Sequence, residues 1–173
     1  MSRLFCFGLG YCATELGRRI IAQGWTVAGT TAHVEKVEHL VEQRFEPFLF
    51  DGTAALHDIA DALQSATHLL LSIPPNADGD PALKWYGDAI AASPSVRWIG
   101  YFSTVGVYGD AAGGWVDETT ETRPGTVRGQ RRVLAENGWI ELARASGKAL
   151  VIYRLPGIYG PGRSAIDQLK AGT

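Results

Sequence analysis

The stretch Leu4–Ala13, LFCFGLGYCA, decides the fold of this chain. Its first four residues are apolar and have the length of a short buried strand, and they run directly into Gly-x-Gly. Apolar residues then recur at helical spacing over residues 16–21. A strand that enters a helix through such a turn is typical of the βα unit that binds the phosphates of a dinucleotide.

Each small residue of this turn has a physical role in that interpretation. Gly8 permits the tight turn, Gly10 leaves the backbone open to a pyrophosphate, and Ala13 is small enough for the helix to pack on the strand. The unpaired N–H groups at the helix start would then face the anion. The alternative is a tight strand-to-helix turn that binds no ligand.

Length and composition restrict the class of protein. The chain has 173 residues, of which 46% are hydrophobic, so it can bury the core of one domain but not of two. The net charge of −2 gives no basic excess, which makes nucleic acid an unexpected partner. No stretch approaches the ~20 apolar residues of a membrane span. We therefore expect a cytoplasmic protein that binds neither nucleic acid nor membrane.

The cysteines and histidines do not have the spacing of a metal site. Cys6 and Cys12 both lie in the glycine-turn region, and we expect reduced thiols that pack in the interior; the alternative for Cys12 is a reactive thiol, because it lies near a helix N-terminus. The histidines fall on separate expected elements and are predicted to be solvated or to cap helices: His33, His39, His57 and His68. No metal is expected.

Strand and helix patterns alternate along the whole chain. After the first βα unit, strands are expected at residues 25–30, 48–50, 68–73, 96–102 and 149–153. Helices are expected at residues 34–44, 56–66, 81–92 and 123–145, the last with an interruption near residues 137–138. Residues 103–125 have no period, which is typical of a functional or disordered segment. The alternation over six strands predicts an α/β fold, a doubly wound parallel sheet of the Rossmann type with helices on both faces.

The end of the second strand bears on the cofactor. In this unit an acidic residue at that place usually holds the ribose 2′-hydroxyl of NAD, whereas this chain has Thr30 and Thr31 there. Without the carboxylate a 2′-phosphate is not repelled, and His33 and Lys36 are candidate cations, so NADP is favoured over NAD. Asp51, after the third strand, either accepts from an adenine amino group or forms a turn.

Three further segments resemble the short-chain dehydrogenase/reductase superfamily, and within it the extended branch with the NAD-dependent epimerase/dehydratase family. Residues 101–109, YFSTVGVYG, are similar to the Ser-Ser-x-x-Val-Tyr-Gly signature. Residues 116–118 followed by Arg123-Pro124 resemble the approach to the active-site helix, and residues 154–162, RLPGIYGPG, resemble the Arg-x-x-x-x-Tyr-Gly-Pro segment. With the glycine turn, four matches stand in the family's order.

The resemblance implies where an NADP or NAD cofactor would lie. The positions are Gly8, Leu9, Gly10, Tyr11 and Cys12 at the pyrophosphate, Asp51, Ser72, Ile73 and Pro74 along adenine and its ribose, and Leu155 and Pro156 near the nicotinamide. For Ser72 and Pro74 the alternative is simple strand termination.

The chain departs from the family at the catalytic pair. Counting back from Glu136, which resembles the family's helix glutamate, places the family's Tyr-x-x-x-Lys at Arg128 and Arg132. A guanidinium is a poor general acid, so these arginines would instead clamp a phosphate or carboxylate, or stabilise an oxyanion; the alternative is a solvated basic helix face. Thr104 stands where the family keeps its catalytic serine.

The resemblance also implies a substrate-binding region after the sheet domain, yet this sequence ends at Thr173. We therefore expect residues 1–173 to form the NAD(P)-binding domain, with that region largely absent. The first functional hypothesis is an oxidoreductase or epimerase/dehydratase that acts on a carbonyl or alcohol of a small-molecule substrate. The second is a non-catalytic NADP(H)-binding regulatory or sensor module. Pairing through helices beside the sheet, common in the superfamily, suggests a homodimer.

Overall fold

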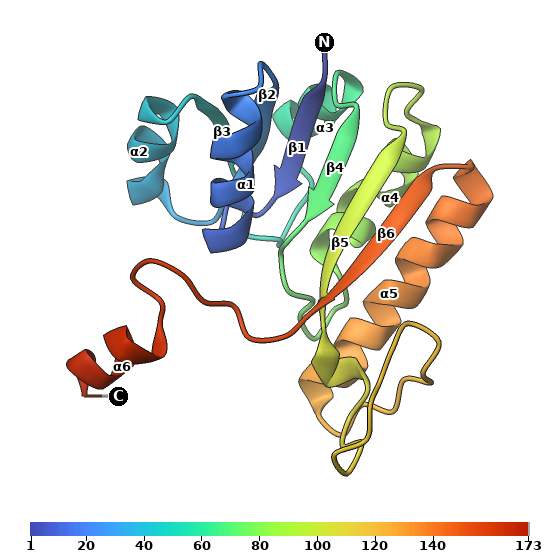
Figure 1. Ribbon diagram of the computed structural model, residues 1–173. Coiled ribbons are helices and arrows are strands. Elements are labelled where there is room, and N and C mark those ends of the chain that lie inside the picture. Colours follow the sequence, from blue (N-terminus) through green and yellow to red (C-terminus); the bar gives the residue numbers. More distant parts are fainter. Residues whose placement is uncertain (173) are drawn as a thin grey trace.

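The computed structural model describes residues 1–172 and contains one six-stranded sheet with the strand order β3-β2-β1-β4-β5-β6 (Figure 1). All neighbouring strands are parallel. The strands are β1 (Arg3–Phe7), β2 (Thr26–Thr31), β3 (Phe45–Leu49), β4 (His68–Leu71), β5 (Trp98–Thr104) and β6 (Ala149–Leu155). The predicted doubly wound α/β fold is confirmed.

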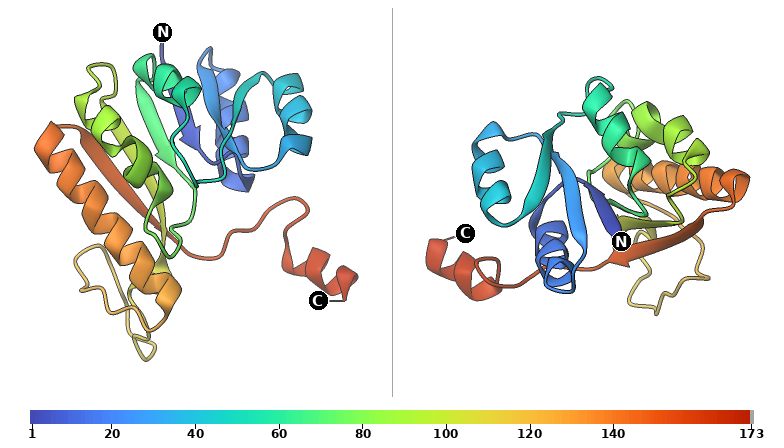
Figure 2. Two further views of the ribbon diagram at one scale, coloured as in Figure 1. Left: turned by 180° about the vertical axis from the view of Figure 1, so that it is seen from behind. Right: turned by 90° about the horizontal axis from the view of Figure 1, so that it is seen from above.

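Five of the helices connect these strands and cover both faces of the sheet, and a sixth follows the last strand. They are α1 (Tyr11–Ile21), α2 (Val37–Glu42), α3 (His57–Gln64), α4 (Pro81–Ala92), α5 (Val127–Ser146) and α6 (Ala165–Ala171), with short 3-10 turns η1 (Val34–Lys36) and η2 (Val105–Val107). The end-on view in Figure 2 shows α1 on one face and α3, α4 and α5 on the other. None of the helices within residues 1–172 has both the length and the apolar character that a membrane crossing needs.

The core consists of two layers that β1 separates. Phe5 and Phe7 point into the larger cluster beneath α3, α4 and α5, whereas Leu4 and Cys6 point into the smaller cluster beneath α1. Successive side chains of a strand face opposite sides of a sheet, so an unbroken apolar run is what a strand covered on both faces requires. Burial raises the pKa of Cys6, consistent with a packing role for its thiol.

Two element predictions near the β3 edge were wrong. The helix expected at residues 34–44 is instead η1 followed by the single short helix α2. The strand expected at residues 48–50 is β3, Phe45–Leu49, and it includes Pro47. Proline lacks the N–H of a ladder residue, but β3 is the edge strand of the sheet, where that loss is tolerated.

The long helix also differs from its prediction. It begins at Val127 rather than residue 123, because the Thr126 hydroxyl caps it by accepting from the N–H of Gly129 at 3.1 Å. It is not interrupted at residues 137–138. A Cβ at Gly138 would lie 2.5 Å from Cδ2 of Leu83 in α4, so this glycine permits close helix packing and does not break the helix.

His68 was wrongly predicted to be solvated or to cap a helix. Its ring is half-buried between Trp25 and Trp98, at centroid distances of 4.7 and 6.0 Å. Burial, together with the charge of Arg97, lowers the pKa of His68. This histidine therefore packs at the amino-terminal edge of the sheet.

A tight contact closes the irregular segment of residues 103–125. Gly109 has φ +73°, and a Cβ there would collide with the backbone carbonyl oxygen of Arg123. Gly113 also has a left-handed backbone, with φ +80°, but a Cβ at this position would meet no atom within 4 Å. Substitution of Gly113 would therefore cost only the strain of a side chain at positive φ, whereas substitution of Gly109 would add the collision.

We predict that Gly109→Ala destabilises the fold more than Gly113→Ala does. Gly113→Ala should lower the free energy of unfolding by about 1 kcal/mol, the cost of an alanine at positive φ. Gly109→Ala should cost a further ~1–3 kcal/mol, because the backbone at Arg123 must move. Urea denaturation of both variants measures the difference. Equal losses would show that the Gly109–Arg123 contact is not tight.

Candidate functional site

The candidate site lies where the order of the strands reverses. The chain leaves β1 for α1 on one face of the sheet and leaves β4 for α4 on the other, and β1 and β4 are neighbours. Ligands of doubly wound folds bind in the crevice that this reversal leaves at the carboxyl ends of the strands. Two pockets open there, and they adjoin at Ser72, which lines both; we call the two together the groove.

The glycine turn forms the floor of this groove. The backbone N–H of Gly8 donates to the Thr30 hydroxyl at 2.8 Å, and the N–H of Leu9 donates to the Thr30 carbonyl at 2.7 Å. Gly8 has φ +97°, and a Cβ there would lie 3.1 Å from Ile73, so the turn itself needs this glycine. Thr30 is buried and holds the turn against β2.

Gly10 differs from Gly8 because the protein's own packing does not require it. Its φ of −87° suits any residue, and a Cβ at this position would meet no atom within 4 Å. It is the N-cap of α1, and among the described residues no side chain caps the first N–H groups of that helix. An open backbone next to uncapped N–H groups is the arrangement that receives an anion from outside the protein.

The pocket on the β2 side of the turn, about 280 Å³ in volume, collects the residues predicted for the adenine half of a dinucleotide. Its lining comprises Gly8, Leu9, Gly10, Thr30, Thr31, Ala32, His33, Lys36, Phe50, Asp51, Ser72, Ile73 and Pro74. The two candidate cations of the sequence analysis, His33 and Lys36, are thus in the same pocket as the glycine turn.

Local hydrogen bonds fix several side chains of this pocket. Asp51 accepts from the N–H of Thr53 at 2.9 Å and from its hydroxyl at 2.7 Å, which lowers the pKa of Asp51. The turn interpretation of Asp51 is therefore confirmed, while its side chain still lines the pocket. Thr31 accepts from the N–H of His33 at 3.2 Å, and the His33 ring lies 3.1 Å from the Glu35 carboxylate.

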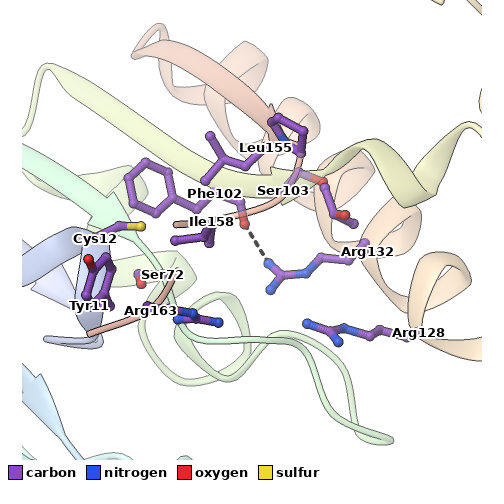
Figure 3. Close-up of a pocket in the computed structure, with 12 residues that line it drawn as sticks. Tyr11, Cys12, Ser72, Phe102, Ser103, Arg128, Arg132, Leu155, Ile158 and Arg163 are labelled. Atoms are coloured by element: carbon purple, nitrogen blue, oxygen red, sulfur yellow. Dashed lines mark hydrogen bonds between the residues drawn. The ribbon is translucent and has the colours of Figure 1, made fainter. Parts of the chain in front are cut away.

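The second pocket, about 330 Å³, lies toward α5 (Figure 3). Its lining comprises Tyr11, Cys12, Ser72, Phe102, Ser103, Thr104, Arg128, Arg132, Leu155, Pro156, Ile158 and Arg163. The fold thus places every predicted site residue in one of the two adjoining pockets. No group of three or more His, Cys, Asp or Glu side chains within residues 1–172 is arranged to hold a metal ion.

Arg132 is fixed in the wall of this pocket. Its side chain is buried, and Nη1 donates to the Phe102 carbonyl at 2.7 Å and to the Tyr101 hydroxyl at 3.1 Å. Burial raises the pKa of Tyr101 to about 12, against the lowering effect of the arginine. The solvated-face alternative is wrong for Arg132, whereas Arg128, one turn earlier on α5, is exposed.

A buried acid lies behind Arg132. Asp80 caps α4 by accepting from the N–H of Leu83 at 3.0 Å, and it accepts from the indole N–H of Trp139 at 3.3 Å. Burial raises the pKa of Asp80, opposed by these hydrogen bonds and by the charge of Arg132.

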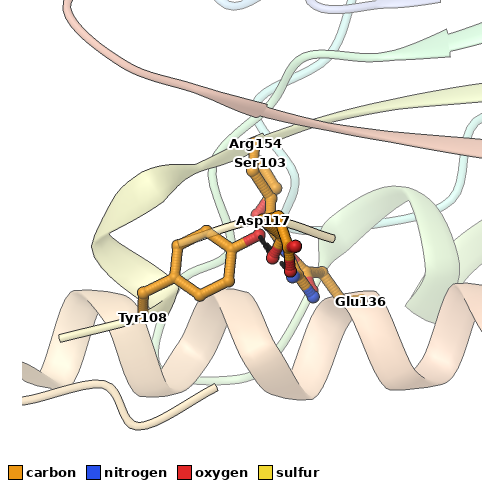
Figure 4. A network of polar contacts seen from close by, with 5 residues as sticks. All are labelled: Ser103, Tyr108, Asp117, Glu136 and Arg154. Atoms are coloured by element: carbon orange, nitrogen blue, oxygen red, sulfur yellow. Dashed lines mark hydrogen bonds and ion pairs between the residues drawn. The ribbon is translucent and has the colours of Figure 1, made fainter. Parts of the chain in front are cut away.

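A polar network supports the other wall of the pocket (Figure 4). Glu136 is buried in α5, accepts from Nη2 of Arg154 at 2.8 Å, and accepts from the hydroxyl of Ser103. Nη1 of Arg154 donates to the Tyr108 hydroxyl at 2.9 Å, which itself donates to the Asp117 carbonyl at 2.7 Å. The bond to Glu136 raises the pKa of Arg154. The network therefore joins β5, α5, β6 and the loop after η2.

This network decides which hydroxyl of β5 is available to a ligand. Ser103 uses its proton in the hydrogen bond to Glu136. The oxygen of Thr104 accepts from the N–H of Gly106 at 3.1 Å, which leaves its proton free. Thr104, the predicted catalytic hydroxyl, is thus the one of the pair that can donate into the pocket.

Arg163 lines the pocket but was not predicted from the sequence. After β6 the chain crosses the carboxyl edge of the sheet toward α1 (Figure 1). There the Tyr11 hydroxyl donates to the Pro161 carbonyl at 3.2 Å, and the Arg163 guanidinium carbon lies 5.7 Å from the centre of the Tyr11 ring. Contacts between residues about 150 positions apart give no periodic signal in the sequence.

Comparison with known proteins shows related chains and a common fold. No known protein-family profile matches this chain. Protein YeeZ of Escherichia coli K12 is 32% identical in an alignment of 173 positions that covers 94% of this chain and 61% of YeeZ. A conserved protein of unknown function from Silicibacter pomeroyi is 42% identical, with a TM-score of 0.80, over 95% of this chain and 56% of that one. This chain therefore spans roughly three fifths of the relatives it matches.

More distant solved structures share the fold alone. UDP-glucuronic acid 4-epimerase from Bacillus cereus, in complex with NAD, is 19% identical with a TM-score of 0.73. The alignment covers 92% of this chain and 58% of the epimerase. The two chains therefore share the doubly wound sheet described above.

We predict that Glu136→Ala destabilises the protein by about 3–5 kcal/mol, because it leaves the half-buried Arg154 unpaired and Ser103 without its acceptor. Glu121→Ala is the matched control, since it breaks an exposed Glu–Arg pair with Arg123 and should leave the unfolding midpoint nearly unchanged. Urea denaturation of both variants tests this. Similar midpoints for the two variants would contradict a structural role for the Glu136 pair.

Proposed function

We propose that this chain is the NAD(P)-binding part of an atypical protein of the short-chain dehydrogenase/reductase type, related to the epimerase/dehydratase family, and that it works as an oxidoreductase or epimerase/dehydratase on a carbonyl or alcohol. The observation that carries the proposal is the open backbone at Gly10, beside the uncapped start of α1 and at the reversal of strand order. The fold shared with an epimerase that binds NAD supports it.

NADP is the proposed cofactor, ahead of NAD. The end of β2 has no carboxylate in the position that usually holds a ribose 2′-hydroxyl, and His33 and Lys36 line the same pocket. Glu35, the nearest acid in the chain, is paired with the His33 ring. A 2′-phosphate in this pocket would meet Lys36 and the His33 ring, and also the Asp51 carboxylate, which Thr53 holds in a local turn.

The residues of the second pocket suggest how a substrate would be treated. A bound nicotinamide cofactor would supply hydride transfer. The free proton of Thr104 can orient a substrate carbonyl, and the fixed charge of Arg132 can stabilise negative charge that develops on its oxygen. Leu155 and Pro156 form the apolar part of the wall. Within the described residues Tyr11 is the one phenol in the lining, and its proton is donated to Pro161.

The second candidate is a sensor module that binds NADP(H) without turnover. Arg128 and Arg132 favour the sensor, because the family that this sequence resembles has its catalytic tyrosine and lysine at these positions. Loss of a positioned proton donor would cost about 10²–10⁴ in rate. Assays of NADPH oxidation against carbonyl compounds and nucleotide sugars separate the two: turnover with any substrate excludes the sensor, and tight binding without turnover favours it.

Gly10→Ser should abolish most NADPH binding without destabilising the fold. Serine caps a helix well, and its Cβ meets open space, so the unfolding midpoint should not move. The new side chain would occupy the space proposed for the pyrophosphate, and NADPH affinity should fall at least about tenfold, as when a bound phosphate loses one good backbone contact. Energy transfer from tryptophan to NADPH gives the affinity.

Gly125→Ser is the control, because Gly125 also faces open space but lies outside both pockets. Equal NADPH binding by Gly10→Ser and the unchanged chain would contradict the proposed pyrophosphate site. Failure of the unchanged chain to bind either NADPH or NADH would contradict the proposed function as a whole.

Lys36→Ala should distinguish the two cofactors. If Lys36 meets the 2′-phosphate, its loss should weaken NADPH about three- to tenfold, the value of one partly exposed charge contact, and leave NADH unchanged. Lys84→Ala, an exposed lysine of α4, is the control. An equal loss of affinity for NADPH and NADH would show that Lys36 does not contact the 2′-phosphate.

A further inference from the structure

Three arginines line the second pocket, and none of the described residues in its lining is acidic. Arg128 and Arg132 come from α5, and Arg163 comes from the segment that follows β6. Figure 3 shows Arg128 and Arg163 extending toward one another across the pocket, with Arg132 between them and the β5 wall. The chain as a whole has a net charge of −2, so this concentration of positive charge is local.

Among the described residues, five of the twelve arginines have a glutamate partner. The paired ones are Arg3, Arg18, Arg19, Arg123 and Arg154. Within residues 1–172 neither Arg128 nor Arg163 makes an ion pair or a side-chain hydrogen bond; Arg163 only stacks on Tyr11. Two guanidinium groups that face each other repel unless an anion lies between them.

Arg132 adds a fixed third charge with donors to spare. Only its Nη1 is engaged, by Phe102 and Tyr101. Among the described residues Nε and Nη2 have no acceptor, and neither is buried. A guanidinium has five N–H donors in a planar fork, which matches the oxygens of a carboxylate or phosphate.

We propose that this pocket, defined by Arg128, Arg132 and Arg163, binds an oxyanion of the substrate, a carboxylate or a phosphate ester. Arg128 and Arg163 hold the anion from two sides, and Arg132 fixes its position against β5. Thr104 lines the same pocket, so the anion lies close to the carbonyl or alcohol that reacts. That the anion belongs to a substrate rests on the proposed function, whereas the anion site itself does not depend on that function.

The site adjoins the one proposed for the cofactor's pyrophosphate, because Tyr11 and Cys12 line the same pocket as the three arginines. The pyrophosphate position is at Gly10, whose pocket contains none of the three arginines. Arg128 belongs to α5, on the opposite side of the groove from α1, so it is the residue that separates the two anion sites in an experiment.

The test is a calorimetric titration of the 173-residue chain with inorganic phosphate and with malonate, at constant ionic strength, with and without saturating NADPH. We expect one of the two anions to bind in the presence of NADPH. Arg128→Gln and Arg163→Gln should each weaken that binding about tenfold or more, since each removes a charged hydrogen-bond donor. Arg144→Gln, an exposed arginine at the other end of α5, should bind as the unchanged chain does.

The outcomes separate this inference from the proposed function. Anion affinity that is the same in Arg128→Gln and the unchanged chain overturns the inference, as does complete displacement of the anion by NADPH, which would place it at the pyrophosphate site. Binding of NADPH with no binding of either anion overturns the inference and leaves the proposed function intact. If the chain binds no nucleotide but binds an anion that requires Arg128, the anion site is supported and the proposed cofactor is contradicted. Unfolding midpoints of all variants exclude a folding defect.

Discussion

The reversal of strand order between β1 and β4 is the constraint on which the rest of the structure depends. Because every strand is parallel, all carboxyl ends lie at one edge, and the helices that follow β1 and β4 must leave to opposite faces. The crevice between them is therefore a consequence of topology and needs no special residue. What the sequence adds is a turn bare enough to admit a ligand, at Gly8 and Gly10.

The second pocket, toward α5, depends on the buried carboxylate of Glu136. Glu136 has two acceptor oxygens in the interior, and Arg154 and Ser103 satisfy both of them. A buried carboxylate without such partners would be strongly unfavourable, so β5, β6 and α5 are held in one relative arrangement. That arrangement sets the positions of Thr104 and of Arg132, which lies on the same helix as Glu136, one turn earlier.

The fold and most of the site could be predicted because both follow from short-range patterns. The alternation of strand and helix segments predicts a parallel sheet, and residues at the carboxyl ends of parallel strands must meet at one edge. The boundary of β3 could not be predicted, because Pro47 is tolerated only through its edge position, which is a property of the assembled sheet. Gly138 was misread for a similar reason, since its role depends on Leu83 in a different helix. Arg163 reaches the pocket through contacts of Tyr11 with a distant segment, which no local pattern encodes.

In the family that the sequence resembles, a tyrosine and a lysine stand where this chain has Arg128 and Arg132, and the two pairs differ in what they can do. A phenol beside an ammonium group moves a proton, whereas a guanidinium holds its proton and acts as a fixed positive charge. Arg132 is buried and hydrogen-bonded to β5, so its charge is positioned before any ligand arrives and costs little reorganisation. Arg128 is exposed and has no partner within the described residues, so it is the arginine free to bind an incoming group. Two fixed positive charges can stabilise negative charge at the end of the groove but do not supply a proton, so a reaction that needs one would take it from another donor, such as Thr104, the substrate or water.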